Sequence, residues 1–448
     1  MSCRSTLETT PVESHRHEAA HACSRKDQGH NSCPHDTRDF PPGFLWGAAM
    51  SSHQVEGNNR WNDWWEYEQS GRLPHSSGEA CRHYEMYEQD FDLARSWGHN
   101  AHRFSIEWSR IEPAEGEWNQ EAVAHYQAVI KALKERGLEP VVTLHHFTNP
   151  AWFSRAGGWL RRDSASVFAR YVELVAERLG KGVRYWLTIN EPTVYVMQAF
   201  INGEWPPLLK GSRFKAVIAF RNLAKAHVLA YRRLHQLCPD AKVGFAHSAP
   251  VVMPCDAQRK RDRIAAALRD FILNRAFFLL IGASFKKRER TARCLDFVGI
   301  NYYTRVMIKS VGWGARALLG QACHLDHHAD RGVMSATGWE VYPVGLKMTL
   351  EKFSHLGVPL FVTENGIATD DETLRRKFIV EHLERLAEAR KAGVNVIGYL
   401  HWSLMDNYEW ALGSEPHFGL AAVDPLTYER QPRPCVEDFQ RICRQNSC

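Results

Sequence analysis

The chain has 448 residues, a length that fits about three ordinary domains or one large α/β barrel. Hydrophobic residues make up 44% of the chain and charged residues 24%, a globular mixture that excludes a fibrous or wholly disordered protein. The formal net charge of +5 is spread over the whole chain and no stretch reaches the length of a membrane span, so we expect neither a nucleic-acid nor a membrane partner.

Residues 1–39 form a separate block that is rich in Ser, Thr, His and charge and nearly free of large apolar side chains. We predict a disordered tail over 1–39 and one folded domain over 40–448. The tail contains HEAAH, whose HExxH spacing places two imidazoles on one helix face for zinc. A polar tail offers no dry cleft, so we predict no catalytic zinc there. Adventitious metal capture is the alternative, by His15, His17, His21, Cys23, His30 and Cys33.

From Phe40 onward, short β-type runs alternate with amphipathic helical patterns, which is typical of parallel βαβ units. Apolar side chains recur at helical spacing before Gly137, after Ser164, and over 371–392. We predict strands over 45–50, 101–108, 139–146, 183–191, 241–248, 296–303, 359–364 and 396–403. Eight strands with interleaved helices indicate the α/β class and a single (β/α)8 TIM barrel, with a doubly wound open sheet as the rival.

The eleven cysteines are scattered from Cys3 to Cys448 without paired short spacings. This pattern indicates neither a disulfide framework nor a zinc site, and it favours reduced thiols. No secretory signal is visible at the start of the sequence, so we predict a cytoplasmic protein. The 15 Trp residues suit ligands with apolar C–H faces, sugars among them, although most Trp side chains pack in cores.

A barrel builds its active site at the carboxyl ends of its strands. Glu191 follows the fourth predicted strand and Glu364 ends the seventh, so the two carboxyls are expected to face each other across the barrel. Either one alone would fit a structural ion pair equally well, whereas the pair fits glycoside hydrolysis. Such a pair works only when the environments of the two carboxyls separate their pKa values, so that one is ionised and the other is protonated. Arg103 is a candidate to keep one carboxylate charged, Tyr303 to donate to it, and Asn190 to bind a sugar hydroxyl.

Eight ordered motifs closely resemble those of family 1 glycoside hydrolases, the β-glucosidase family, from about residue 40 to 434. They are FLWGAAMSSHQVEG, HRFSIEWSRI, TLHHFTNPAWF, TINEP, GINYYTR, GWEVYPVGL, FVTENGI and HWSLMDNYEWALG. The resemblance, strongest to bacterial and archaeal β-glycosidases, implies a retaining exo-β-glycosidase, most simply a β-glucosidase acting on small β-glycosides or oligosaccharides. It implies Glu364 as nucleophile and Glu191 as acid and then base, with no metal and no organic cofactor.

The resemblance also implies roles around the catalytic pair. Arg103, Asn301 and Tyr303 are expected to hold the nucleophile, and Trp339 to form the platform of the leaving-group side. The remaining candidates are expected to bind or enclose the terminal sugar, through Gln54, His146, Asn190, Trp402, Glu409 and Trp410.

Several features leave the specificity and even the activity open. A carboxylate at Glu409 would repel a sugar 6-phosphate and disfavours that branch of the family. Phe147 and the segment 414–417 depart from the family pattern and are expected at the pocket wall, so β-galactosidase or β-fucosidase activity of broad specificity stays open. The span 249–295 looks short and includes a basic run at 286–288. A non-catalytic sugar-binding barrel also fits the resemblance, and GxGxxA at 312–317 would fit an oxidoreductase.

Overall fold

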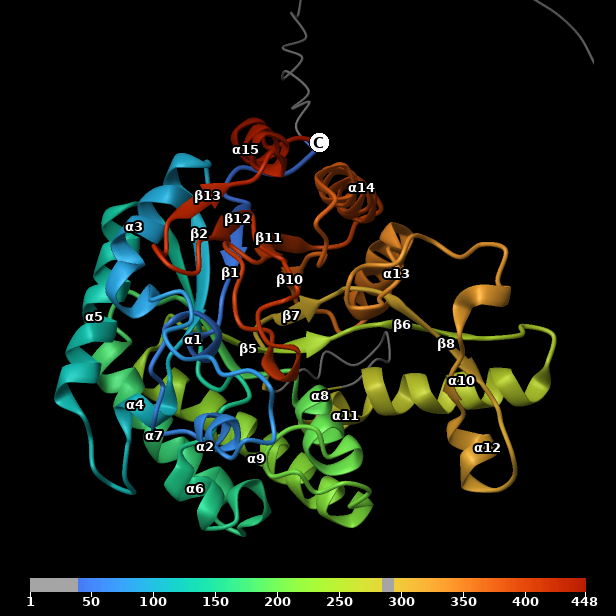
Figure 1. Cartoon of the computed structure of the whole chain (residues 1–448), viewed down its shortest axis with the longest axis horizontal. Helices are drawn as coiled ribbons and strands as arrows, with labels where there is room; N and C mark the ends of the chain where they lie inside the picture. Colours follow the sequence, from blue (N-terminus) through green and yellow to red (C-terminus); the bar gives the residue numbers. More distant parts are fainter. Residues whose placement is uncertain (1–38, 284–293) are drawn as a thin grey trace, which may run out of the picture. The chain divides into compact units, whose positions relative to one another are not determined.

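The computed structural model describes residues 39–283 and 294–448 (Figure 1). The HEAAH motif of the predicted tail and the basic run at 286–288 lie outside the described residues. In the part of the chain that is described, no helix is both long and apolar enough to cross a membrane.

Eight parallel strands close into a barrel in the order β1-β11-β10-β7-β5-β4-β3-β2. Each predicted strand run coincides with one of them to within a few residues, so the barrel prediction is confirmed and the open sheet is wrong. Several strands end two or three residues before the predicted limit, where the chain leaves the ladder to form pocket loops. The strands are β1 (Leu45–Ala49), β2 (Ala101–Ser105), β3 (Glu139–Thr143), β4 (Tyr185–Asn190), β5 (Lys242–Ser248), β7 (Val298–Asn301), β10 (Leu360–Asn365) and β11 (Val396–Trp402).

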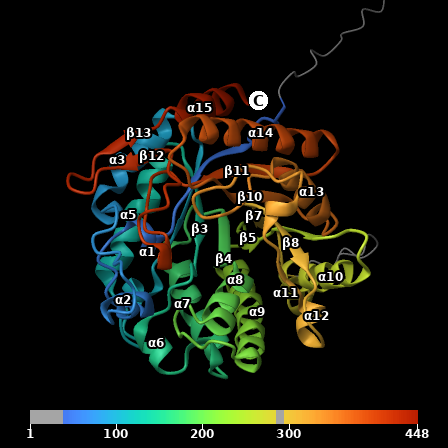
Figure 2. The same ribbon diagram turned by 45° about the vertical axis from the view of Figure 1, so that its right-hand side comes forward.

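Helices surround the barrel and bury their apolar faces against it (Figure 2). Local chemistry sets their ends, because Asn119 and Asp371 accept hydrogen bonds from the first turns of α5 and α14. The longer helices are α3 (His83–Ser96), α5 (Gln120–Glu135), α7 (Ser164–Leu179), α9 (Arg213–Leu237), α10 (Lys260–Asn274), α13 (Pro343–Ser354), α14 (Glu372–Lys391) and α15 (Cys435–Gln445).

Short helices form much of the rim. They are α1 (Ser52–Val55), α2 (Asp63–Gln69), α4 (Trp108–Ile111), α6 (Ala151–Arg155), α8 (Pro192–Val196), α11 (Ala276–Leu280) and α12 (Ala315–Leu319). Single turns of 3-10 helix are η1 (Gly158–Leu160), η3 (Leu325–His327) and η4 (Trp410–Leu412), and η2 (Met197–Asn202) is a π-helix.

A three-stranded sheet outside the barrel was not predicted. It has the order β6-β8-β9, with β6 (Val251–Pro254) parallel and β9 (Gln321–Ala322) antiparallel to β8 (Arg305–Lys309). Helix α10 packs against this sheet, and α12 packs against α10, on one side of the barrel (Figure 1). The GxGxxA segment connects antiparallel β8 and β9, so it is not part of a βαβ unit and the oxidoreductase interpretation is wrong. A small hairpin joins β12 (Ala421–Val423) and β13 (Arg430–Pro432).

Candidate active site

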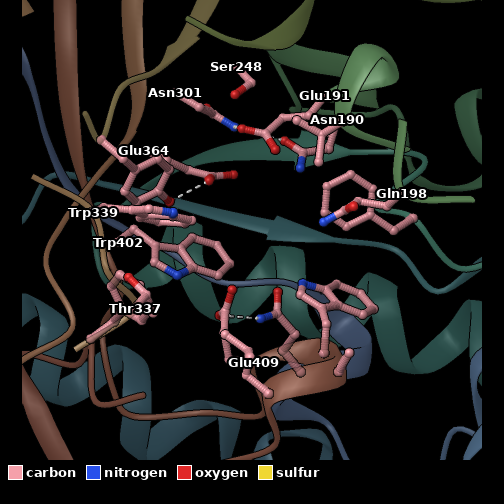
Figure 3. A pocket seen from close by; sticks show the side chains of 18 of the residues that line it. Asn190, Glu191, Gln198, Ser248, Asn301, Thr337, Trp339, Glu364, Trp402 and Glu409 are labelled. Atoms are coloured by element: carbon pink, nitrogen blue, oxygen red, sulfur yellow. Dashed lines mark hydrogen bonds between the residues drawn. The ribbon is translucent and has the colours of Figure 1, made fainter. Parts of the chain in front are cut away.

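A pocket of about 420 Å³ opens at the carboxyl ends of the barrel strands (Figure 3). Every residue predicted for the site lines this pocket except Arg103, which is fully buried and bound to the pocket residue Glu364. The group of potential metal ligands found within the described residues lies elsewhere. The pocket is therefore lined by side chains from five strands and several loops, and Arg103 adds a sixth strand, as expected for the carboxyl ends of barrel strands.

Glu191 lies where β4 turns into α8. Its backbone is in the left-handed region, with φ 42°, and Pro192 begins the helix. The register between β4 and β5 shifts just before this point, and the Glu191 amide donates to the carbonyl of Ala246 at 2.8 Å. This turn aims the carboxyl into the pocket. Phe147 and Trp410, at the same pocket, also have positive φ, so uncommon backbone conformations cluster at this site.

Glu364 lies near the end of β10, also beside a register shift. Gly366 follows shortly after, and a Cβ there would come within 1.8 Å of the Trp402 carbonyl oxygen. Only glycine permits this close approach between β10 and β11. The end of β10 is thereby held against its neighbour, with the Glu364 side chain facing that of Glu191 across the pocket (Figure 3).

The two carboxyls have different partners. Arg103 Nη1 donates to Glu364 Oε1 at 2.5 Å, and Tyr303 Oη donates to Glu364 Oε2 at 2.7 Å. Glu191 accepts from Asn301 Nδ2 at 3.0 Å and has no ion pair among the described residues. A guanidinium stabilises an anion far more than a neutral amide does. The negative charge of the pair therefore resides on Glu364.

Burial and charge separate the pKa values accordingly. Burial, and then repulsion from the charge of Glu364, raise the pKa of Glu191 to about 8. Burial also raises the pKa of Glu364 above its usual range, but the positive charge of Arg103 and the hydrogen bond from Tyr303 oppose that shift. Of the two groups, Glu191 is the one favoured to hold a proton and Glu364 the one favoured to be ionised, which is the division of labour that acid-assisted nucleophilic substitution needs.

A buried network ties the two carboxyls together. Arg103 Nη2 donates to Asn190 Oδ1 at 2.7 Å, and Asn301 Nδ2 donates to the same oxygen at 3.1 Å. Asn301 also donates to Glu191, although the sequence placed it with the nucleophile, and its amide additionally lowers the pKa of Glu364. Asn301 therefore lies between the two carboxyls and contacts the network on both sides.

Polar and aromatic groups close one end of the pocket. Gln54 Nε2 donates to Glu409 Oε2 at 3.2 Å, and Asn190 Nδ2 lies 3.2 Å from His146 Nε2. Burial, followed by repulsion from Glu364, raises the pKa of Glu409 to about 8. The ring of His146 is stacked relative to those of Trp402 and Trp410, with centroids 6.0 and 6.2 Å away. This end offers hydroxyl-binding groups beside flat aromatic faces.

The other end is more open. Trp339 is 38% exposed, and its ring centroid lies 5.1 Å from that of Tyr303. Thr337 comes from the same segment, between β9 and α13 (Figure 3). An exposed aromatic side chain beside the two facing carboxyls suits the stacking of a leaving group.

Some lining residues were missed or misplaced by the sequence-based prediction. Trp205 lines the pocket and packs on Trp410, with centroids 5.7 Å apart, and Gln198 enters from the π-helix η2. A tryptophan in a proline-rich loop was the available signal for Trp205, whereas a π-helix has none in sequence. Phe147 lines the pocket as expected. The described lining does not include 414–417, whose His417 instead contacts Asp370 at 2.6 Å.

A (β/α)8 barrel with two unlike carboxyls facing each other at its carboxyl end is the arrangement that glycoside hydrolysis by carboxyl groups needs. The model of glycosyl hydrolase family 1 matches the chain over residues 36–286 and 284–448. The chain belongs to this family.

Relatives span nearly the whole chain. A β-galactosidase from Pyrococcus woesei is 30% identical, covering 91% of this chain and 97% of the relative. The structure of a β-glycosidase from Pyrococcus horikoshii superposes with a TM-score of 0.84 at 44% identity, covering 91% and 95% of the two chains. The structure of a β-glucosidase from Thermotoga maritima in complex with glucoimidazole also superposes with a TM-score of 0.84, at 28% identity, and covers 91% of this chain and 99% of that chain.

Proposed function

We propose that this hydrolase is a retaining exo-β-glycosidase that removes terminal β-D-glucosyl residues, with Glu364 as nucleophile and Glu191 as acid and base. The supporting observation is the asymmetry of the pair, because Glu364 has a cation and a phenol as partners while Glu191 has an amide. Chemistry of this type by carboxyl groups requires no metal and no organic cofactor.

In the first step, the Glu364 carboxylate attacks the anomeric carbon as the glycosidic bond breaks. Glu191 gives its proton to the departing oxygen, and a glycosyl ester of Glu364 forms. In the second step, Glu191, now ionised, takes a proton from water. The resulting hydroxide attacks the anomeric carbon, and the bond to Glu364 breaks. Two inversions return the β configuration, and Arg103 and Tyr303 stabilise the Glu364 carboxylate before it attacks and again when the second step releases it.

Exo action follows from the closed end of the pocket. Gln54, Glu409 and the His146–Asn190 pair offer donors and acceptors for the hydroxyls of one terminal sugar. Glu409, whose pKa is raised to about 8, can donate to and accept from sugar hydroxyls while it is protonated, and it repels a phosphate where it is ionised. A neutral sugar fits this environment better than a 6-phosphorylated one. We assign the leaving group to the more open end of the pocket, beside Trp339. Varied aglycones can be accommodated there.

A second specificity is a broad one that includes galactosyl and fucosyl groups. It is favoured by the relative from Pyrococcus woesei, which is described as a β-galactosidase. Glucose and galactose differ only at the 4-hydroxyl, so one hydrogen bond near Gln54 and Glu409 decides between them, with a difference of about 0.5–1.5 kcal/mol in binding.

The eight described cysteines are free thiols, and several of them are buried. Free thiols persist in a reducing compartment, so we place the protein in the cytoplasm. Thiol titration of the denatured protein, isolated with a rapid alkylating agent present, tests this assignment. Alkylation of every cysteine is expected, and disulfide-linked peptides would contradict it.

Proton NMR of the full chain with nitrophenyl β-D-glucoside tests the activity. Early release of β-glucose is expected, and early α-glucose would refute double displacement by the Glu191–Glu364 pair. Release from the galactoside or fucoside at a comparable rate would support the broad specificity. The variant Glu364→Gln tests the non-catalytic barrel, because an enzyme loses turnover, whereas a sugar-binding barrel shows no turnover before or after the change and keeps its sugar affinity.

A further inference from the structure

Four soft metal ligands converge outside the active site, on the sheet β6-β8-β9. Their ligand atoms, two thiol sulfurs and two imidazole nitrogens, all lie within 4.8 Å of one another. Three members are half-buried and His327 is exposed. The outer cluster, as we name it, consists of Cys255, Cys323, His327 and His328.

The sheet positions both cysteines by backbone hydrogen bonds. Cys255 follows β6, and its amide donates to the Ile308 carbonyl of β8 at 2.8 Å. Cys323 follows β9 on the opposite side of β8, and its amide donates to the Met307 carbonyl at 2.8 Å. The two thiols therefore approach each other across one strand. The histidines come from η3 and the residue after it, in the same segment as Cys323, so two segments remote in sequence meet in the outer cluster.

The separations match tetrahedral coordination. Ideal Zn–S and Zn–N bonds of about 2.3 and 2.05 Å at tetrahedral angles place sulfur and nitrogen about 3.6 Å apart. Cys255 Sγ lies 3.2 Å from His327 Nε2 and 3.6 Å from His328 Nε2. Cys323 Sγ lies 3.9 and 3.3 Å from the same two nitrogens. An isolated thiol–imidazole hydrogen bond would bring together one such pair, whereas here both sulfurs are near both nitrogens.

We propose that the outer cluster binds a structural Zn²⁺ ion. Two thiolates and two neutral imidazoles form a closed S₂N₂ set, which selects zinc by ligand type and geometry. Binding releases the two thiol protons to solvent, and the two thiolates then balance the charge of the dication. This proposal revises the expectation from the scattered cysteine spacing, because the sheet brings together two cysteines that are remote in sequence.

The ion would tie η3 to the sheet at the start of a segment that reaches the active site. Farther along, Arg305 of β8 holds the same segment, donating to Asp330 at 2.8 Å and to Glu340 at 2.6 Å. Thr337 and Trp339, which line the open end of the pocket, lie in the segment between Asp330 and Glu340. The proposed site thus stabilises the segment that carries Thr337 and Trp339 at the leaving-group end of the pocket, and it does not contact the catalytic carboxyls.

Zinc content of the full chain, produced without an affinity tag in zinc-supplemented medium, tests the site. We expect about one tightly held zinc per chain in the wild type, lost in the double variant Cys255→Ser/Cys323→Ser. Matched controls are Cys238→Ser, a half-buried thiol elsewhere, and His324→Asn, next to the cluster but not in it. Both should retain the ion. Unchanged zinc in the double variant would overturn the proposal.

The tail motif needs its own control, because HEAAH can capture metal independently. The variant His17→Ala/His21→Ala should keep the zinc, and loss of the ion there would assign it to the tail and overturn the proposal. Replacement by Co²⁺ gives a second readout. Tetrahedral thiolate coordination produces intense visible bands and a sulfur-to-cobalt charge-transfer band, and octahedral-type weak bands would refute the assigned ligands.

A variant at the exposed ligand guards against misfolding of the double variant. His327→Asn should fold and weaken Co²⁺ binding by at least about 100-fold, while His324→Asn leaves it unchanged. Intact-mass analysis of the freshly isolated, unreduced protein shows whether Cys255 and Cys323 are thiols or a disulfide. A disulfide between Cys255 and Cys323, or a chain that takes up no zinc and no cobalt with both thiols reduced, would overturn the proposal.

Discussion

The proton on Glu191 determines how activity depends on pH. With a pKa of about 8, this carboxyl is protonated in roughly nine-tenths of molecules at pH 7, half at pH 8 and one-tenth at pH 9. The first step needs that proton for a poor leaving group, so kcat/KM should fall about tenfold per unit above pH 8. Glu364 must be ionised, and its pKa is raised above its usual range, so activity should also fall on the acid side. The expected profile is bell-shaped.

Replacing Glu191 by Ala should remove the alkaline limb selectively. Two glucosides distinguish the acid role, a methyl glucoside that needs protonation of its leaving oxygen and a dinitrophenyl glucoside that does not. We expect kcat/KM to fall by about 10²–10⁴ for the former and only slightly for the latter. Turnover should fall for both, because the second step needs Glu191 as base. Glu177→Ala, an exposed glutamate on α7, should leave both substrates unaffected.

Two results would refute this assignment. Equal losses of kcat/KM for the two glucosides would mean that Glu191 does not protonate the leaving group. An alkaline limb that persists in Glu191→Ala would assign that titration to another group, of which Glu409 is the first candidate because its pKa is also raised to about 8.

Three further predictions concern the surrounding residues. Arg103→Met should move the acid limb of kcat/KM upward by about 1–3 pH units, because Glu364 loses its cation, whereas Arg103→Lys should keep most of the wild-type profile. A pH profile that stays in place in Arg103→Met would contradict this role. Glu409 has a pKa of about 8 against an ordinary value of 4.5, so its contribution to stability is complete below pH 4.5 and lost as pH rises through 8. The free energy of unfolding in urea should therefore fall with pH over this interval in the wild type and fall less steeply in Glu409→Gln. The two slopes should differ by up to about 1.4 kcal/mol per pH unit. Parallel pH dependences would argue against a protonated Glu409. Trp339→Ala should raise KM for aryl glucosides roughly two- to tenfold with little change in kcat, and an equal effect on methyl glucoside would exclude aglycone stacking.

Much of the barrel could be predicted because its rules are local. Strands buried on both faces read as short apolar runs, as in 359–364, and helices show apolar spacing with a polar cap, as at Asp371. Chain order then determines the parallel topology, and the topology determines that strand ends meet. Glu191 and Glu364 were found for this reason, and the ordered motifs added the residues around them.

The outer sheet was missed because its elements are too short for a periodic signal. Strand β6 has four residues and β9 has two, and both depend on pairing with β8 rather than on local propensity. The outer cluster was missed with it. Cysteine spacing along the chain indicated no zinc site, because one ligand comes from the end of β6 and the others from beyond β8.

The sequence by itself determined the class of fold and the family, and it singled out the two carboxyls that we propose as the catalytic pair, since these depend on local pattern and on chain order. The resemblance implied the roles of the two carboxyls, but only the tertiary structure gave a physical basis for them, because Arg103 pairs with Glu364 and not with Glu191. The placement of Asn301 between the two carboxyls, of Trp205 at the pocket wall and of the outer cluster was decided in the same way. Distances between side chains from remote segments are set by packing, and no local pattern encodes them.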